Sequence, residues 1–398
     1  MSGVEPLPPN ARLLHIGPHK SGTTAVQGAF HQARERLADH GITYIGKGLH
    51  PVRPVQAITG RGPMLGEPAA ATRDWENLVA EVAATGDQRA VISSEFFADA
   101  DEDAVRRVVS DLGDNVHVVV TLRPLGKVLA AQWQQYVQNG IRDPFDEWLD
   151  IMFNRPHERP NSAFWRRHQQ GEIVTRWANA VGPENLTVIC VDDSDPRMLM
   201  SAFEGLLDLP EGFLVPDDSQ ANRSLTHAEA ELVRSFNQQF KAGSWPTGLY
   251  ASHIRRGAVK RMKVAYKPTR HDQAIRTPEW ALERAAKIGS EAAETITALG
   301  VRVVGDLELL SQYPSGRAGT PDPDVAVPPQ AAAQALMGVV AASAKQSAVR
   351  PKKPTRVDDR PLREVTARQL ARELLARGVR KARRGRNRIL RSRGGSSS

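Results

Sequence analysis

The chain is poor in cysteine and in long apolar runs. One of its 398 residues is cysteine, Cys190, so no disulfide can form within the chain and no Cys/His cluster has zinc-site spacing. Cys190 lies in the apolar run LTVICV and is expected to be a buried structural thiol. No run of eighteen apolar residues occurs, so no transmembrane helix is predicted. The start, MSGVEPLPPNAR, lacks the features of a secretory signal, and a cytoplasmic location is expected.

The basic character of the chain is confined to one end. The chain has 53 Lys and Arg against 45 Asp and Glu, a net charge of +8. Residues 351–398 hold 16 Lys and Arg and 4 Asp and Glu, which is +12, so +8 less +12 leaves −4 for the rest. The body therefore gives no charge-based reason to expect a specific nucleic-acid partner. The tail, 360–398, has a Leu/Val stripe at helical intervals. It is predicted to be a basic amphipathic helix that lies on an anionic membrane surface, holds nucleic acid or stays solvated.

Residues 13–41, LLHIGPHKSGTTAVQGAFHQARERLADHG, carry the strongest local pattern. A short apolar run leads into a loop with Gly17 and Gly22, and apolar residues then recur at helical spacing. A strand, a glycine loop and a helix in this order place backbone N–H groups and a positive helix end around a phosphate. The two glycines enclose four residues, as in a Walker A motif. The lysine of that motif is replaced by Thr23, and a lysine lies inside the loop, at Lys20.

The wording HIGPHKSGTTAVQ resembles the phosphosulfate loop of sulfotransferases that use 3′-phosphoadenosine 5′-phosphosulfate (PAPS), above all the bacterial and carbohydrate-type members. The resemblance implies PAPS as co-substrate, no metal, and Lys20 as a catalytic residue at the bridging oxygen. It implies that the loop part of the donor site consists of Lys20, Ser21, Gly22, Thr23 and Thr24, with the two threonines on the 5′-phosphate. An ordinary glycine turn with a solvated lysine is the alternative.

A second resemblance lies at the end of the β-branched run 116–122, where Arg123 follows. In the family, an Arg at a strand end and a Ser eight residues later bind the 3′-phosphate of PAPS. Here the second position is Ala131, so Gln132 or Lys127 has to supply the missing donor. The alternative is an arginine that pairs with a carboxylate at the strand end.

Glu95 ends a short buried strand in the segment VISSEFF, which resembles the strand-end SSE of bacterial relatives. By this resemblance Glu95 is the general base that takes the proton of an acceptor hydroxyl. Other members of the superfamily use a histidine, so His19 and His15 are lesser candidates, and His15 is expected to be packed in the core. A structural salt bridge is the alternative for Glu95.

Three weaker patterns occur later in the chain. The element N-R-S at 222–224 resembles an N-x-S element that closes over the nucleotide. Residues 255–257, R-R-G, resemble a basic loop over the 3′-phosphate, although a solvated basic patch explains them equally. The aromatic residues that either line an acceptor pocket or belong to the core are Trp133, Tyr136 and Trp148.

Strands that alternate with helices predict one α/β domain at 10–310, with a P-loop-like parallel sheet of about five strands flanked by helices. Residues 302–304 are read as a last strand or an extension, 46–71 as a long loop, and about 163–180 as one helix. The Pro/Ala-rich segment 311–359 is predicted to be a disordered linker, with an Ala-rich helix near 331–342.

The predicted function is transfer of a sulfuryl group from PAPS to a hydroxyl of a carbohydrate, glycolipid or small molecule. The product, 3′-phosphoadenosine 5′-phosphate (PAP), would be released. One alternative is a P-loop kinase or NTPase, with Asp192 as its Walker B carboxylate. The other is a non-catalytic protein that binds a membrane through its tail. The Ala/Arg-rich composition is typical of a bacterial chain.

Overall fold

The computed structural model describes residues 4–63, 67–159, 164–216, 223–313, 316, 318–319 and 325–348. The chain divides into two compact units, 1–340 and 341–398. The predicted α/β body lies within the first unit. The basic tail, parts of the predicted linker and Asn222 lie outside the described residues.

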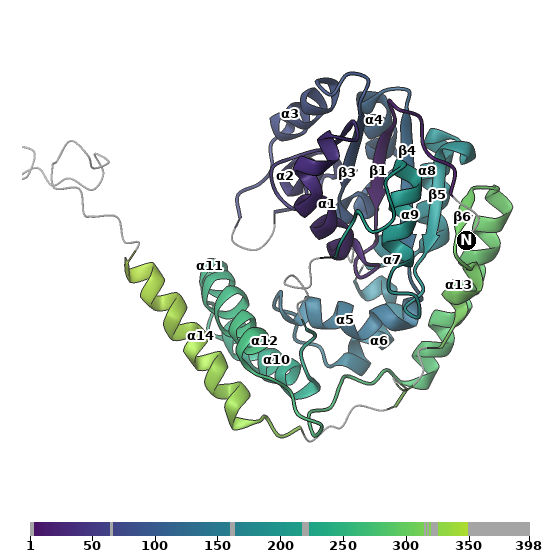
Figure 1. Ribbon diagram of the computed structural model, residues 1–398. Coiled ribbons are helices and arrows are strands. Elements are labelled where there is room, and N and C mark those ends of the chain that lie inside the picture. The colour runs from purple at the N-terminus through teal and green to yellow at the C-terminus, as the bar shows by residue number, and fades with distance from the viewer. Residues whose placement is uncertain are drawn as a thin grey trace, which may run out of the picture. The chain divides into compact units, whose positions relative to one another are not determined.

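Six parallel strands form the sheet in the described part of the chain, in the order β2-β3-β1-β4-β5-β6 (Figure 1). Their bounds are β1 (Arg12–Ile16), β2 (Ile42–Tyr44), β3 (Arg89–Ser93), β4 (Val116–Leu122), β5 (Leu186–Cys190) and β6 (Arg302–Val304). The predicted α/β class with a helix-covered parallel sheet is confirmed. The sixth strand is the segment that the sequence left open between a strand and an extension.

Helices follow the strands along the chain. Their bounds are α1 (Thr23–Ala38), α2 (Val52–Thr59), α3 (Thr72–Ala83), α4 (Glu102–Leu112), α5 (Leu125–Val137), α6 (Phe145–Phe153), α7 (Phe164–His168), α8 (Gln170–Val181), α9 (Met198–Leu207), α10 (His227–Ala242), α11 (Thr247–Leu249), α12 (Lys260–Ala265), α13 (Glu279–Leu299) and α14 (Pro329–Ala348). A 3₁₀ turn, η1 (Glu95–Asp99), follows β3, and a π-helical segment, η5 (Tyr250–Val259), joins α11 to α12. Among these described elements no helix is long and apolar enough to cross a membrane.

Three predicted segments differ from the structure or refine the prediction. The stretch 46–71 is not all loop, because it contains α2, whose Val55 is fully buried. Pro54 is compatible with this helix, because it lies in the first turn, where proline leaves no hydrogen bond unmade. The single helix predicted near 163–180 is wrong, because α7 and α8 are separated at Gln169. The Ala-rich helix predicted near 331–342 is confirmed by α14.

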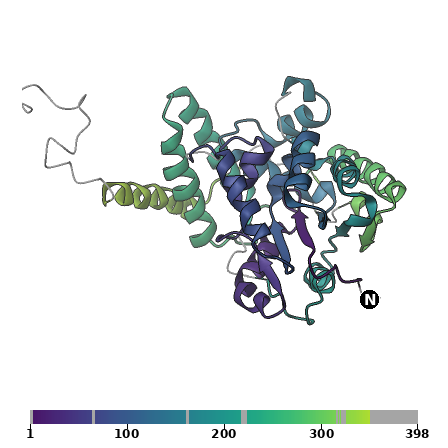
Figure 2. The same ribbon diagram turned by 90° about the horizontal axis from the view of Figure 1, so that it is seen from above.

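The sheet is covered on both faces, and alternate side chains serve the two faces. Leu14 and Val118 pack with residues of α4 and α8, whereas Leu13 and Val119 pack with residues of α1 and α9. All seven residues of β4 are buried. Figure 2 shows the helices on either side of the strands. Fully burying each such aliphatic side chain is worth about 1.5–3 kcal/mol, so packing on both faces stabilises the strands whose ends carry the predicted site.

A third apolar cluster joins α5, α6, α10 and α13. Trp133 and Trp148 are fully buried in it, and Tyr136 packs against it. The indole nitrogen of Trp133 donates to the carbonyl of Asp143 at 3.1 Å. The two tryptophans are therefore core residues, which is the second of the two alternatives that the sequence left open for them.

Candidate functional site

The glycine loop is folded back on itself at the carboxyl end of β1. The N–H of Ser21 donates to the carbonyl of Pro18 at 3.1 Å, and its hydroxyl donates to the same oxygen at 2.8 Å. That hydroxyl also lies 2.9 Å from Oγ1 of Thr121 on β4. The loop is therefore closed by its own hydrogen bonds and tied to β4, the strand beside β1.

Gly17 and Gly22 are required by this geometry for different reasons. A side chain at Gly17 would place its Cβ 2.3 Å from Oγ1 of Thr23 and 2.7 Å from Oγ1 of Thr121. Gly22 has φ 95° and immediately precedes α1, a conformation that favours glycine. Thr23 and Thr24 then open α1, and the N–H groups of a first helical turn have no partner within the helix. The result is a row of donors at the positive end of the α1 dipole.

Lys20 adopts φ 75°, which is uncommon for a residue other than glycine. Such a conformation costs of the order of 1–3 kcal/mol and is found most often at functional sites. The side chain keeps contact with solvent. Enough protein surrounds it that desolvation lowers the pKa of Lys20, and the Glu95 carboxylate opposes that shift. Lys20 and Glu95 are thus electrostatic neighbours, although they are 75 positions apart in the sequence.

Glu95 is the first residue of η1, directly beyond β3, which pairs with β1 in the sheet. Its Oε2 accepts a hydrogen bond from Nε2 of Gln27 at 3.1 Å and lies 3.7 Å from Nδ1 of His50. About 20% of the Glu95 side chain is exposed. No Lys or Arg salt bridge to this carboxylate occurs in the described residues. Its proton-accepting oxygens are therefore not consumed by a guanidinium.

Arg123 follows β4 and reaches both the loop and an acid. Its Nη1 donates to the carbonyl oxygen of Lys20 at 3.4 Å, and its Nη2 pairs with Asp193. Nε of Arg123 is buried and makes no hydrogen bond to any described residue. Lys127 forms an ion pair with the same carboxylate, with Nζ 2.9 Å from Oδ2 of Asp193. The carboxylate pairing that the sequence offered as an alternative is therefore present, and it leaves part of the guanidinium unused.

Ala131 lies on α5, half-buried, and offers no side-chain donor. Of the two residues that the sequence proposed as substitutes, Gln132 is buried, and its Oε1 makes no hydrogen bond within the described residues. Lys127 lies beside Arg123 because both contact Asp193. Lys127 is thus the better placed of the two.

The two candidate histidines have different surroundings. His15 is fully buried in β1, with Nδ1 2.8 Å from Oγ of Ser93 and Nε2 3.1 Å from Oγ1 of Thr121. Burial lowers its pKa to about 3, so it is a neutral core histidine, as expected. His19 lies in the loop, and Nε2 is 3.4 Å from Nη1 of Arg61. Burial and the neighbouring arginines lower the pKa of His19 well below its usual value.

An arginine pair that the sequence did not predict lies beside the loop. Arg61 and Arg167 both pair with Asp99, whose side chain is only 5% exposed. The Arg61 guanidinium also lies over the Phe96 ring, 3.8 Å from its centroid. Two arginines that share one buried carboxylate leave an excess positive charge beside His19. Nothing in the sequence connects positions 61, 99 and 167.

Asp192, the carboxylate on which a kinase reading depends, closes a local turn. Its Oδ1 accepts the N–H of Ser194 at 2.8 Å, and this hydrogen bond lowers its pKa. The neighbouring Asp193 holds Arg123 and Lys127. Both carboxylates at the end of β5 already have partners, whereas a P-loop kinase needs a carboxylate there that is free to hold Mg²⁺.

The weaker sequence patterns have structural roles. Arg223 donates to both carboxylate oxygens of the fully buried Glu229 at 2.7 Å and to the carbonyl of Met262 at 2.8 Å. It therefore joins α10 to α12. Residues 255–257 lie inside η5. Lys263 on α12 was not predicted; burial, then Lys20 and Arg223, lower its pKa to about 8.

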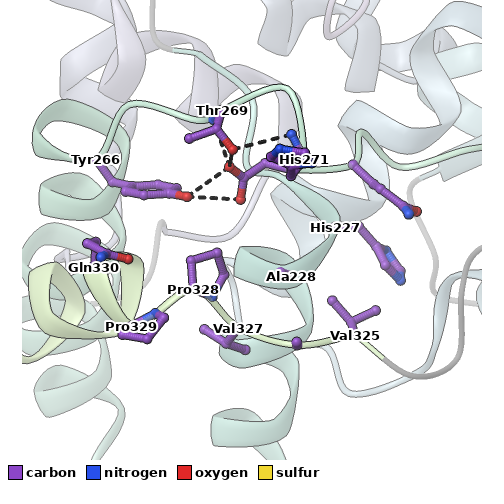
Figure 3. A pocket seen from close by; sticks show the side chains of 13 residues that line it. His227, Ala228, Tyr266, Thr269, His271, Val325, Val327, Pro328, Pro329 and Gln330 are labelled. Atoms are coloured by element: carbon purple, nitrogen blue, oxygen red, sulfur yellow. Dashed lines mark hydrogen bonds between the residues drawn. The ribbon is translucent and has the colours of Figure 1, made fainter.

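A cavity of about 480 Å³ lies elsewhere, between the start of α10, the segment 266–273 and the segment that precedes α14 (Figure 3). Tyr266 and Thr269 point toward one carboxylate, and the hydroxyl of Tyr266 donates to Asp272 at 2.9 Å. None of its lining residues belongs to the glycine loop, and neither Glu95 nor Arg123 lines it. The cavity is therefore separate from the strand ends that carry the predicted site.

No protein-family model matches the chain, and no curated protein matches it. Among solved structures, a sulfotransferase from Alicyclobacillus acidocaldarius is similar over 60% of this chain and 94% of its own, with 14% identity and a TM-score of 0.38. With values this low, the likeness does not by itself support an argument about function. The evidence on function lies in the residues at the strand ends, Lys20, Glu95 and Arg123.

Proposed function

We propose that this protein is an enzyme that transfers a sulfuryl group from PAPS to a hydroxyl of a carbohydrate, glycolipid or small-molecule acceptor. The observation that carries the proposal is the juxtaposition of Lys20 and Glu95 at the carboxyl ends of the adjacent parallel strands β1 and β3. Ligands of open α/β sheets bind at that edge. A cation inside the phosphate loop and a carboxylate beside it suit transfer of an anionic group to a hydroxyl.

The residues present fit the donor. The N–H groups at the start of α1 suit the 5′-phosphate, because they converge at the positive end of the helix. The buried, unpartnered Nε of Arg123 and the ammonium of Lys127 supply cationic donors for a second phosphate, the 3′-phosphate. That second phosphate distinguishes PAPS from ordinary adenine nucleotides, so it is the part of the donor that a test has to address.

The roles of the protein groups follow from their charges. Glu95 accepts the proton of the acceptor hydroxyl while the hydroxyl oxygen forms a bond to sulfur. The bond between sulfur and the bridging oxygen of the donor breaks, and negative charge develops on that oxygen. Lys20 stabilises this charge by a fixed electrostatic interaction. The products are a sulfate ester and PAP, with the proton on Glu95.

Thermal melting with PAP, and separately with ATP and Mg²⁺, tests the proposal. We expect PAP to raise the melting temperature without Mg²⁺ and a variant with Arg123→Ala to lose most of that response. A response to Mg-ATP with none to PAP would support a P-loop kinase or NTPase and overturn the sulfotransferase proposal. Binding of PAP without turnover of any acceptor would favour a non-catalytic protein. Incubation with ³⁵S-labelled PAPS and pooled hydroxyl acceptors distinguishes a sulfotransferase from a non-catalytic protein that binds PAP.

A further inference from the structure

One face of α14 is fixed against the rest of the first unit. Ala331 is fully buried, and Ala335 and Val339 pack against the apolar cluster of α5, α6, α10 and α13. A Cβ on Gly338 would lie 2.5 Å from the carbonyl oxygen of Gly257, so the two backbones approach closely. These contacts hold residues 331–339 of α14 against the cluster and η5.

The opposite face exposes large apolar side chains. Leu336 is 69% exposed, Met337 49% and Val340 57%. On α12, which Figure 1 shows beside α14, Val264 is 69% exposed. Nε of Arg261 on α12 donates to Oε1 of Gln334 on α14 at 3.0 Å, which ties the two helices together. Leu336, Met337 and Val340 lie within two turns on one face of α14, and apolar side chains gathered in this way mark an interaction site more often than isolated ones do.

The composition of α14 strengthens the contrast. Residues 329–344, PQAAAQALMGVVAASA, contain no charged side chain, and the first charge of the helix is Lys345. An ordinary surface helix carries charged residues on the face that points away from the core. The outward face of α14 is therefore unusual for a helix that stays in water.

The chain beyond α14 indicates what the occupant is. Residues 351–398 hold 16 Lys and Arg and 4 Asp and Glu, whereas the rest of the chain has a net charge of −4. An apolar helix face followed by a polybasic segment combines the two signals that stable membrane attachment requires. A protein interface is less well matched, because stable ones involve roughly 20–30 residues on each side and this stripe offers three large side chains.

We propose that the outward face of α14, defined by Leu336, Met337 and Val340, docks on an anionic lipid surface. The aliphatic side chains enter the boundary between headgroups and acyl chains, and the basic residues 351–398 supply the electrostatic attraction. This inference does not depend on the proposed sulfuryl transfer.

Co-sedimentation of the full-length protein with vesicles tests it. The vesicles contain phosphatidylcholine alone or mixed with phosphatidylglycerol, at low and high salt. We expect binding to the anionic vesicles, weakened by salt because screening shortens the reach of charge. The double variant Leu336→Ser/Val340→Ser should bind about tenfold or more weakly, since two aliphatic side chains no longer leave water. Val215→Ser, at another exposed valine, is the matched control and should bind as the wild type does.

Three results would overturn the inference, provided that thermal melting shows the double variant to be folded. Equal vesicle binding by the wild type and the double variant would assign all attachment to the basic segment. If the wild type does not bind the anionic vesicles at low salt, a lipid surface is excluded as the partner of this face. A concentration-dependent dimer that the double variant loses, measured by light scattering, would identify the face as an interface between two copies of the chain.

Discussion

Replacement of Arg123 by alanine should remove the preference of this site for a 3′-phosphate. PAP at 100 times its Kd adds about 2.7 kcal/mol to the free energy of unfolding. Unfolding a unit of 340 residues has an entropy of about 0.7 kcal/mol/K, so PAP should raise the melting temperature of the wild type by about 4 °C. Loss of a hydrogen bond to a charged group costs about 1.5–3 kcal/mol, which raises Kd about 10- to 150-fold. At the same PAP concentration the variant should shift by about 2 °C or less.

Adenosine 5′-monophosphate is the control ligand, because it lacks the 3′-phosphate and retains the other parts. Its effect on the melting temperature should be the same in wild type and Arg123→Ala. Arg106→Ala is the control variant, since that arginine is 63% exposed on α4 and its ion pairs within the described residues are with Glu102 and Asp103 of the same helix. The ligand-free variant should lose little stability, because the Arg123–Asp193 pair is partly exposed and such pairs contribute about 0–1 kcal/mol.

Two outcomes would refute the reasoning. An undiminished PAP response in Arg123→Ala would exclude Arg123 as a phosphate ligand. An equal loss of response to PAP and to adenosine 5′-monophosphate would show that Arg123 acts through the loop, by its hydrogen bond to the Lys20 carbonyl, and not on the 3′-phosphate.

Three further predictions concern the neighbouring charges. Glu95→Gln should lower turnover of ³⁵S-labelled PAPS about 10²- to 10⁴-fold and leave the melting shift with PAP unchanged; wild-type turnover would remove Glu95 as the base. Lys20→Ala should lower turnover about 10²- to 10³-fold, with partial recovery in Lys20→Arg, and equal loss in both would argue against a role for the charge alone. The pKa of Lys263 is lowered from 10.5 to about 8, so its charge disfavours the folded state below about pH 8 and ceases to do so as pH rises to 10.5. Lys263→Gln should therefore raise the melting temperature near pH 7 and not at pH 10.5, and calorimetry that finds the same gain at both would contradict this cause.

Local patterns carried much of the fold. The strand, glycine loop and helix at 13–41 could be read from the sequence because each part depends on neighbouring residues. A capping box, which depends on residues only three positions apart, starts α10: the N–H of Glu229 donates to Thr226 at 3.2 Å, and the N–H of Thr226 donates to Glu229 at 2.9 Å. The β-branched run 116–122 became the fully buried β4, because such runs suit a strand covered on both faces.

Short or interrupted elements were not readable in the same way. α2 has eight residues and a proline in its first turn, so periodicity was too brief to reveal it, and its stability comes from packing of Val55. The break between α7 and α8 likewise leaves the apolar pattern almost unchanged, although it brings Nε2 of Gln170 to 2.7 Å from the Arg123 carbonyl.

By itself the sequence determined the strand, glycine loop and helix at 13–41, the class of the sheet and the three strand ends that bear Lys20, Glu95 and Arg123. Only the tertiary structure decided their surroundings. It joined Arg61 and Arg167 through Asp99, across 38 and 68 positions, and it turned a stretch without charged residues into an exposed apolar face on α14. The physical reason is that secondary structure is encoded by periodicity over a few residues, whereas charge pairing and exposure depend on which distant elements pack together.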